Sequence, residues 1–148
     1  MPLQIVVGLL VGTINIVIHA WLTVATIRVA RGAALKRTAR PWLHLIGVMI
    51  ATVLMLMLAH TLEVFIWSTA YAVLNVAPDG ADLAYFAFVN YTTLGYGDVL
   101  PVARWRLLGP MTAMNGVLLF GWSTAVIFEV LRRTIALNAS FASSSPER

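Results

Sequence analysis

One stretch of the chain reads Thr92-Thr93-Leu94-Gly95-Tyr96-Gly97-Asp98. A protein that strips water from a cation must present several oxygens toward one axis, whereas an ordinary strand points successive carbonyls to opposite sides. Gly95 and Gly97 reach left-handed backbone angles at little cost, so alternating handedness can turn consecutive carbonyls the same way. Thr93 adds a hydroxyl to its carbonyl. This stretch therefore predicts a backbone site for a cation.

The residues before this stretch predict a short helix. Asp79 and Asp82 precede an apolar run, and acidic residues suit the positive start of a helix. A helix from about Gly80 to Thr92 is only about 19 Å long, roughly half of what is needed to cross a bilayer. The chain must then turn back, which a membrane tolerates only where irregular backbone is buried in protein or lines a watery cavity.

Composition indicates that the chain lies in a membrane. Of 148 residues, 60% are apolar and only 11% are charged. Three stretches are long and apolar enough to cross the bilayer: residues 1–27, a second span from Pro41 toward Pro78 whose only formal charge is Glu63, and Leu107–Phe128. A cleaved signal peptide is the alternative for the first stretch, but its basic start is missing. Gly8 and Gly12 in that span predict close packing with another helix.

The stretch at 92–98 resembles the TVGYGD selectivity filter of the potassium channel pore-domain superfamily, with Leu94 in the Val position. The resemblance covers about residues 80–130, as pore helix, filter and inner helix. It implies a homotetramer around one ion path, with K⁺ as the permeant ion and no cofactor. By this resemblance K⁺ binds at Thr93, Leu94, Gly95, Tyr96 and Gly97, and Thr92 and Asp98 support the filter.

We therefore expect an all-α membrane protein with three transmembrane helices and a re-entrant pore helix and filter between the second and third. The expected parts are an N-terminal helix and basic loop (1–40), a pore domain (41–137) and a short cytoplasmic tail (138–148). The expected function is a potassium-selective channel; a non-selective cation channel and a non-conducting accessory subunit are the alternatives. An enzyme is not expected, because the acidic residues are too scattered for a catalytic pair.

Basic residues predict the orientation. Five of the ten lie in one loop between apolar runs: Arg28, Arg31, Lys36, Arg37 and Arg40. Lys and Arg beside spans stay on the cytoplasmic side, which puts the N-terminus outside and the C-terminus inside, in the plasma membrane. Arg104 and Arg106 oppose this orientation but are outnumbered. The bases are not interleaved with stacking aromatic residues, so membrane lipids are expected as partners and nucleic acid is not.

A few polar residues stand inside the spans. His60 and Glu63 lie three apart on one helical face, and ionisable residues there are functional candidates. They either brace the pore helix from behind or sense protons; a metal site built from them lacks ligands within one chain. His19 and His44 are expected to be interfacial or packing residues. Tyr96 is expected to point away from the ion path and pack against Tyr85 and Phe86.

The third span offers candidates for a gate. Gly116 lies close to where the inner helices of the resembled family often carry a hinge glycine, and Gly121 is the alternative hinge. Glu129 either forms a ring of charge at the cytoplasmic mouth or pairs with Arg132 or Arg133 at helical spacing. Asn115 either faces the central cavity or joins helices by hydrogen bonds.

Overall fold

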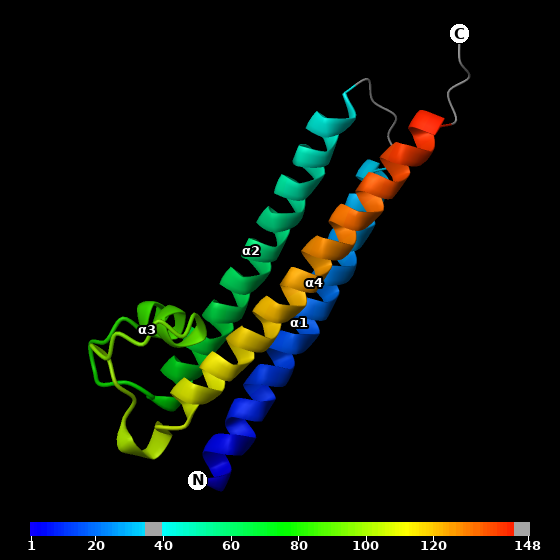
Figure 1. The fold of residues 1–148 in the computed structure, drawn as a ribbon. Helices are drawn as coiled ribbons and strands as arrows, with labels where there is room; N and C mark the ends of the chain where they lie inside the picture. The colour runs from blue at the N-terminus through cyan, green and yellow to red at the C-terminus, as the bar shows by residue number, and fades with distance from the viewer. Residues whose placement is uncertain (35–39, 144–148) are drawn as a thin grey trace. The chain divides into compact units, whose positions relative to one another are not determined.

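The computed structural model describes residues 1–34 and 40–143, with the side chains of 34 and 139–143 left out of the description. Its elements are α1 (Pro2–Ala34), α2 (Pro41–Leu74), α3 (Leu83–Tyr91), the short 3₁₀ helix η1 (Ala103–Trp105) and α4 (Leu108–Ser143) (Figure 1). These described ranges contain helices and no strand. The prediction of an all-α membrane protein with a short helix between the second and third long ones is confirmed. Lys36 and Arg37 of the basic loop lie outside the described residues.

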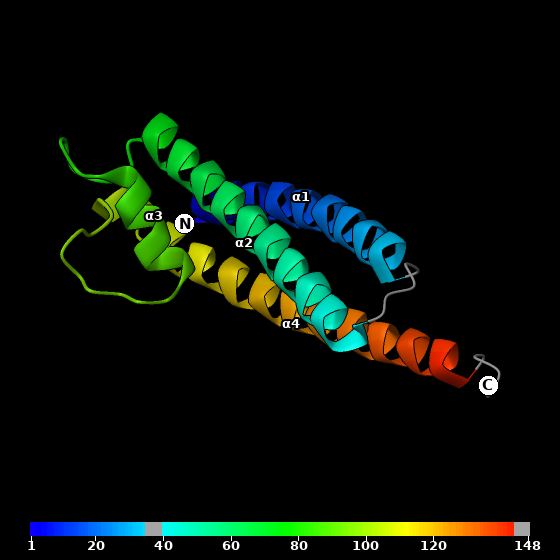
Figure 2. The same cartoon turned by 90° about the horizontal axis from the view of Figure 1, so that it is seen from above.

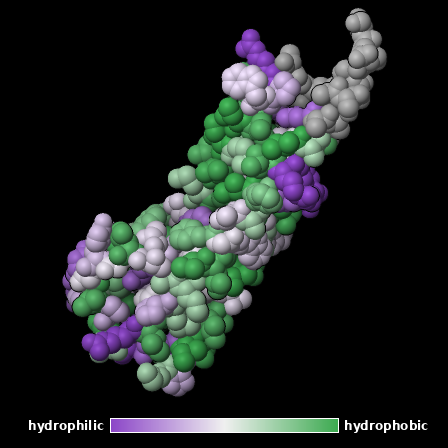
Figure 3. Space-filling model, in the orientation of Figure 1, coloured by the Kyte–Doolittle hydropathy of each residue, from purple (hydrophilic) through white to green (hydrophobic). Residues whose placement is uncertain are grey.

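Three helices are long and apolar enough to cross a membrane: Pro2–Ala33, Pro41–Leu74 and Ala103–Asn138. Their apolar side chains lie largely on the outside, and the space-filling view shows apolar residues over most of the visible face of the long helices (Figure 3). An apolar exterior suits contact with lipid. The third helix is longer than the predicted span of Leu107–Phe128, because α4 continues through the basic residues to Ser143 and so includes the start of the expected tail.

The chain divides into two compact units. The first unit consists of Met1–Ala20 and Ala59–Gly121, and so contains α3 and the 92–98 stretch. The second consists of Trp21–Leu58 and Trp122–Arg148. Within the first unit, α3 lies beside the end of α2 and the beginning of α4, as two views at right angles show (Figures 1 and 2). All candidate filter residues belong to this unit.

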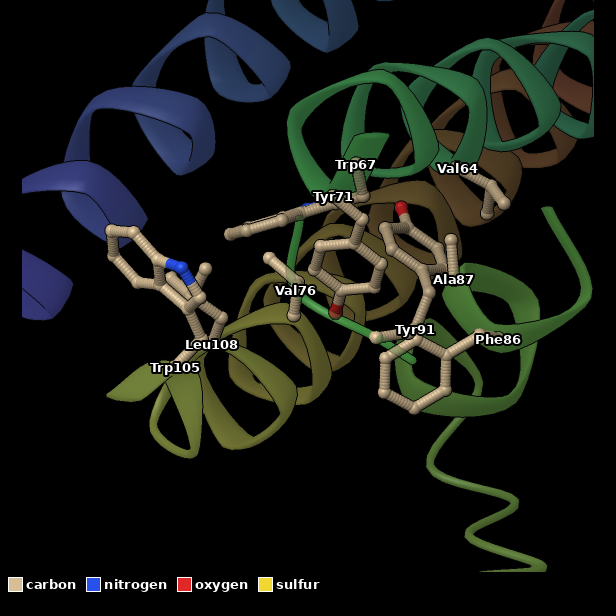
Figure 4. Close-up of a cluster of buried hydrophobic side chains, with 10 residues drawn as sticks. Val64, Trp67, Tyr71, Val76, Phe86, Ala87, Tyr91, Trp105 and Leu108 are labelled. Carbon is tan, nitrogen blue, oxygen red and sulfur yellow. The ribbon is translucent and has the colours of Figure 1, made fainter. Parts of the chain in front are cut away.

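Aromatic side chains form the core of the first unit (Figure 4). Tyr71 of α2 packs against Phe86 of α3, with ring centroids 5.1 Å apart. The Tyr71 hydroxyl also contacts the hydroxyl of Thr112 on α4 at 2.6 Å. Tyr71 of α2 therefore contacts both α3 and α4. The buried core consists of Val64, Trp67, Tyr71, Val76, Ala77, Phe86, Ala87, Tyr91, Trp105 and Leu108.

Local sequence signals explain where these helices begin and end. Pro41 is the first residue of α2, where its missing N–H has no intrahelical partner to lose. α2 ends at Leu74, because Asn75 adopts a left-handed φ of 50° and the Val76 amide donates to the Tyr71 carbonyl at 3.0 Å. Asp82 caps α3 by accepting from the Tyr85 amide at 3.0 Å. α3 thus starts later than the predicted Gly80.

Gly8 and Gly12 of α1 face α4 within the first unit. A Cβ built on Gly8 would lie 2.3 Å from Sδ of the flexible Met111 side chain, and one on Gly12 would be in ordinary contact, 3.6 Å from Asn115 Nδ2. Gln4 adds a bond by accepting from the Leu107 amide at 2.9 Å. The two glycines therefore lie on the face of α1 that packs on α4 within one chain.

The second unit has a smaller apolar core of its own. Its buried residues come from α1, α2 and α4 and are Ala30, Val48, Leu56, Val126 and Val130. Near the end of α4, the Asn138 side chain donates to the Pro41 carbonyl at 3.5 Å. These contacts join the described ends of three helices.

Gly116 is a packing position. A Cβ built there would lie 2.1 Å from the carbonyl oxygen of Tyr91, the last residue of α3. A backbone atom cannot move aside as a flexible side chain can, so only glycine fits. Gly121 differs, because nothing lies within 4 Å of a Cβ built on it. The role expected for Gly116 was flexibility, whereas its environment in the structure is a close contact between α4 and α3.

We expect Gly116→Ala to lower the thermal midpoint of unfolding in detergent micelles, because the added methyl must push α3 and α4 apart. Overpacking of this kind costs about 1–3 kcal/mol. Gly121→Ala is the matched control on the same helix, and it should hold or raise the midpoint, since alanine favours helix over glycine by about 1 kcal/mol. Equal midpoints for the two variants would contradict the close contact at Gly116.

Candidate filter and buried carboxylate cluster

The backbone of residues 93–97 alternates in handedness. Thr93, Gly95 and Gly97 have positive φ angles of 61°, 61° and 78°, while the intervening Leu94 and Tyr96 do not have positive φ. Both glycines therefore adopt the geometry expected of them. Thr93 was not expected there, because a β-branched residue rarely adopts positive φ. With this alternation, successive carbonyls of an extended segment can face the same side.

The carboxyl end of α3 holds the start of this segment. The Thr93 amide donates to the Asn90 carbonyl at 3.0 Å, and the Leu94 amide donates to the Val89 carbonyl at 2.9 Å. The Thr92 hydroxyl donates to the Phe88 carbonyl at 2.7 Å. The two amide bonds use carbonyls that a helix end would otherwise leave without partners. The chain thus leaves α3 in a fixed direction.

The end of the segment is tied back to the first turn of α3. The Tyr85 hydroxyl donates to Asp98 Oδ2 at 2.7 Å, and the Val99 amide donates to Asp98 Oδ1 at 3.1 Å. The hydrogen bond to Asp98 raises the pKa of the Tyr85 phenol above its ordinary value. Asp98 thereby supports the segment through tyrosine. Both ends of the segment are anchored on α3.

Tyr96 is 67% exposed within one chain. Of the two aromatic residues expected to pack against it, Phe86 packs against Tyr71 and Tyr85 donates its hydroxyl to Asp98. The expected packing of Tyr96 stays a prediction. Leu94 is 54% exposed. The outer side of the segment therefore presents its side chains away from the core of its own chain.

Glu63 is the centre of a buried polar cluster behind α3. Its side chain is fully buried, and it contacts His19 of α1 between Oε1 and Nδ1 at 2.8 Å. Oε2 lies 3.1 Å from Nδ1 of His60 and accepts a short hydrogen bond from the Tyr91 hydroxyl. Burial of a carboxylate is costly unless it is paired and hydrogen-bonded. Glu63 meets this condition by joining α1, α2 and α3.

A second polar cluster joins α1, α2 and α4. Asn115 of α4 accepts from Trp67 Nε1 and from Asn15 Nδ2, each at 3.0 Å. Asn15 also lies 3.3 Å from the Glu63 carbonyl. Asn115 is buried. Of its two expected roles, the structure therefore shows the one in which it joins helices by hydrogen bonds. This network links α1, α2 and α4 where lipid could supply no hydrogen bond.

Glu129 forms ion pairs within α4. It contacts Arg132 at 2.9 Å and also pairs with Arg133, at helical spacings of three and four residues. Of the two roles expected for Glu129, the structure therefore shows the local pair with arginine. The pairs are largely exposed, so their contribution to stability is small. His44, expected at an interface or in packing, is partly buried in α2 and belongs to the second unit, whereas Glu63 belongs to the first.

Sequence reasoning missed three members of these clusters. His19 was expected at an interface or in packing, yet it is fully buried against Glu63. Tyr91 and Asn15 were not singled out. A signal existed for α1, since Asn15 and His19 lie four apart in an otherwise apolar span and therefore share a face. Polar residues at that spacing indicate a face that meets polar partners.

We expect Glu63→Gln to lower the thermal midpoint of unfolding in detergent micelles. The amide keeps the size of the side chain but loses acceptor capacity toward His19, His60 and the Tyr91 hydroxyl, and unsatisfied buried groups cost about 1–3 kcal/mol each. Glu129→Gln makes the same chemical change at a partly exposed site, where water can replace the lost partner, and should alter the midpoint little. A Glu63→Gln protein as stable as the wild type would argue against the bracing role.

Comparison with known proteins agrees with this geometry. A family model described as "Ion channel" matches residues 59–133, just over half of the chain. The match takes in the later part of α2, all of α3, the 92–98 segment and most of α4. No curated protein and no solved structure matches the chain. With three helices able to span a bilayer and a family match of this extent, the chain belongs to the ion channel family.

Proposed function

We propose that the protein is a potassium-selective channel that conducts K⁺ passively through a pore built from four copies of the chain. The observation that carries this proposal is the alternating backbone of Thr93, Gly95 and Gly97, anchored at both ends on α3. In this proposal the carbonyls of residues 93–97 replace the water around a desolvated K⁺ ion, and Thr92 and Asp98 hold the segment in place.

Potassium selectivity is proposed because every filter position that carries a carbonyl in the resembled signature is present here. Leu94 replaces Val without changing the backbone oxygen. Gly95 and Gly97 have the left-handed φ angles that the arrangement requires. The α3 carbonyls and Tyr85 anchor the segment and so limit how far it can move. A ring of firmly held segments has a fixed diameter and therefore prefers one ion size, whereas a loosely held ring would not.

A homotetramer is proposed because one chain supplies one segment and a ring is needed to surround an ion. Exposure of the segment supports this assembly, since residues 92–98 are exposed along their length in the chain. Leu94 and Tyr96 present large apolar side chains there, which copies of the chain would cover. The ion path then runs along the fourfold axis, with α4 as the inner helix.

α1 is proposed to brace the pore module from outside the ion path. It contributes His19 and Asn15 to the buried clusters and packs Gly8 and Gly12 on α4. These contacts lie in the first unit, which also contains α3 and the filter. α1 therefore stabilises the wall against which the filter rests.

The selectivity proposal is tested by flux in liposomes that contain the purified full-length chain. We expect efflux down a K⁺ gradient and little flux down an equal Na⁺ gradient. Gly97→Ala should abolish this difference or the flux itself, because a Cβ in left-handed geometry costs on the order of 1–2 kcal/mol in each of four chains.

Gly80→Ala is the matched control for that variant. Gly80 has a φ of 82° and open space around a built Cβ, just as Gly97 does, but it lies in the loop before α3. It should share the backbone strain and keep K⁺ selectivity. Wild-type protein that passes Na⁺ as readily as K⁺ would indicate a non-selective cation channel.

Orientation is tested in intact cells with single cysteines, which the Cys-free chain makes straightforward. We expect Pro2→Cys to react with a membrane-impermeant thiol reagent from outside, because the excess of Lys and Arg in the 28–40 loop favours the cytoplasmic side for that loop. Arg40→Cys should react only after the cells are permeabilised. The reverse pattern would place the amino terminus in the cytoplasm.

A further inference from the structure

Three metal-ligating side chains meet inside the first unit, apart from the filter. They are His19 of α1 with His60 and Glu63 of α2, and one ligand atom from each lies within 4.8 Å of the others. His19 and Glu63 are fully buried, and the side chain of His60 is 16% exposed. The sequence alone offered only two of the three ligands, because α1 and α2 come together only in the fold.

The ligand atoms lie close enough together to surround one ion. The His19 nitrogen lies 2.8 Å from Oε1 of Glu63, and the His60 nitrogen lies 3.1 Å from Oε2. One ligand atom from each of the three residues lies within 4.8 Å of the others. Ligand atoms on a tetrahedral Zn²⁺ ion with bonds of about 2.0–2.1 Å lie roughly 3.3 Å apart, so the side chains adjust when the ion binds.

The donor set selects the kind of ion. Two imidazoles and one carboxylate are a known zinc ligand set, and imidazole favours first-row transition metals. Ca²⁺ and Mg²⁺ prefer sites built from oxygen alone. The carboxylate offsets one of the two charges of the ion, which lowers the cost of holding it away from water. Four-coordinate Zn²⁺ suits a site with three protein ligands and little room.

Groups around the cluster would orient the ligands. The Tyr91 hydroxyl donates to Oε2 of Glu63 and lies 2.9 Å from Nδ1 of His60. Phe120 packs on the His60 ring at a centroid distance of 4.7 Å. A hydrogen-bonded carboxylate and an apolar wall are the surroundings that strengthen metal sites.

We propose that His19, His60 and Glu63 form a binding site for Zn²⁺ that fastens α1 to α2 behind the pore helix. One ion binds per chain. Binding does not depend on ion conduction, so this proposal and the proposed channel function fail or succeed in separate measurements.

Metal binding is tested on the purified full-length chain in detergent micelles. After treatment with a chelator, the protein is incubated with Zn²⁺, desalted and assayed for bound metal. We expect one Zn²⁺ per chain in the wild type and loss of binding in His60→Gln and Glu63→Gln. His44→Gln removes a histidine of the same helix outside the cluster and should retain one Zn²⁺. Wild-type protein that retains no Zn²⁺, or cluster variants that retain it fully, would overturn the site.

A variant with a different metal ligand distinguishes loss of the site from unfolding of the protein. His60→Cys replaces one ligand by a thiolate, the only sulfur ligand of this type in the chain. Incubated with Co²⁺, this variant should show a thiolate-to-cobalt charge-transfer band that the wild type lacks. The Tyr91→Phe variant should keep the site but bind Zn²⁺ about 10–100-fold more weakly, since it loses an orienting hydrogen bond. A His60→Cys protein that binds Co²⁺ without this band would show that the ion sits elsewhere.

Discussion

Backbone that leaves regular helix needs other hydrogen-bond partners for its polar groups. Residues 92–98 leave α3 in this way, and α3 supplies partners from both of its ends. Carbonyls at its carboxyl end accept from the Thr93 and Leu94 amides, while the Tyr85 hydroxyl near its start donates to Asp98. The position of residues 92–98 therefore depends on the position of α3. Contacts that fix α3 also fix this segment.

Three sets of contacts fix α3. Phe86 and the other aromatic residues pack it against α2, Gly116 lets α4 approach its last carbonyl, and Tyr91 ties it to Glu63. Apolar packing has little directional preference. The polar contacts at Tyr91 are directional and so set the position of the helix along and around its axis. The two kinds of contact act together at one short element.

The sequence predicts the spans and the filter because both depend on local signals. Apolar stretches longer than about 20 residues indicate helices across a bilayer, and Gly95 and Gly97 indicate a left-handed alternation. The sequence does not predict that His19 meets Glu63, since this depends on how α1 is rotated against α2. The close contact at Gly116 was not predicted for a related reason. A glycine that allows bending and one that allows close approach look alike until the neighbouring backbone is placed.

Tyr91 contacts two distant parts of the chain through opposite ends of one residue. Its carbonyl oxygen lies against Gly116 of α4, and its hydroxyl lies on Glu63 of α2 and near His60. A shift of α4 that moves this carbonyl therefore changes the geometry around the buried carboxylate. Thermodynamic linkage makes this coupling reciprocal. Any change of charge or ligand at Glu63 that favours one position of Tyr91 must favour the matching position of α4 by the same free energy.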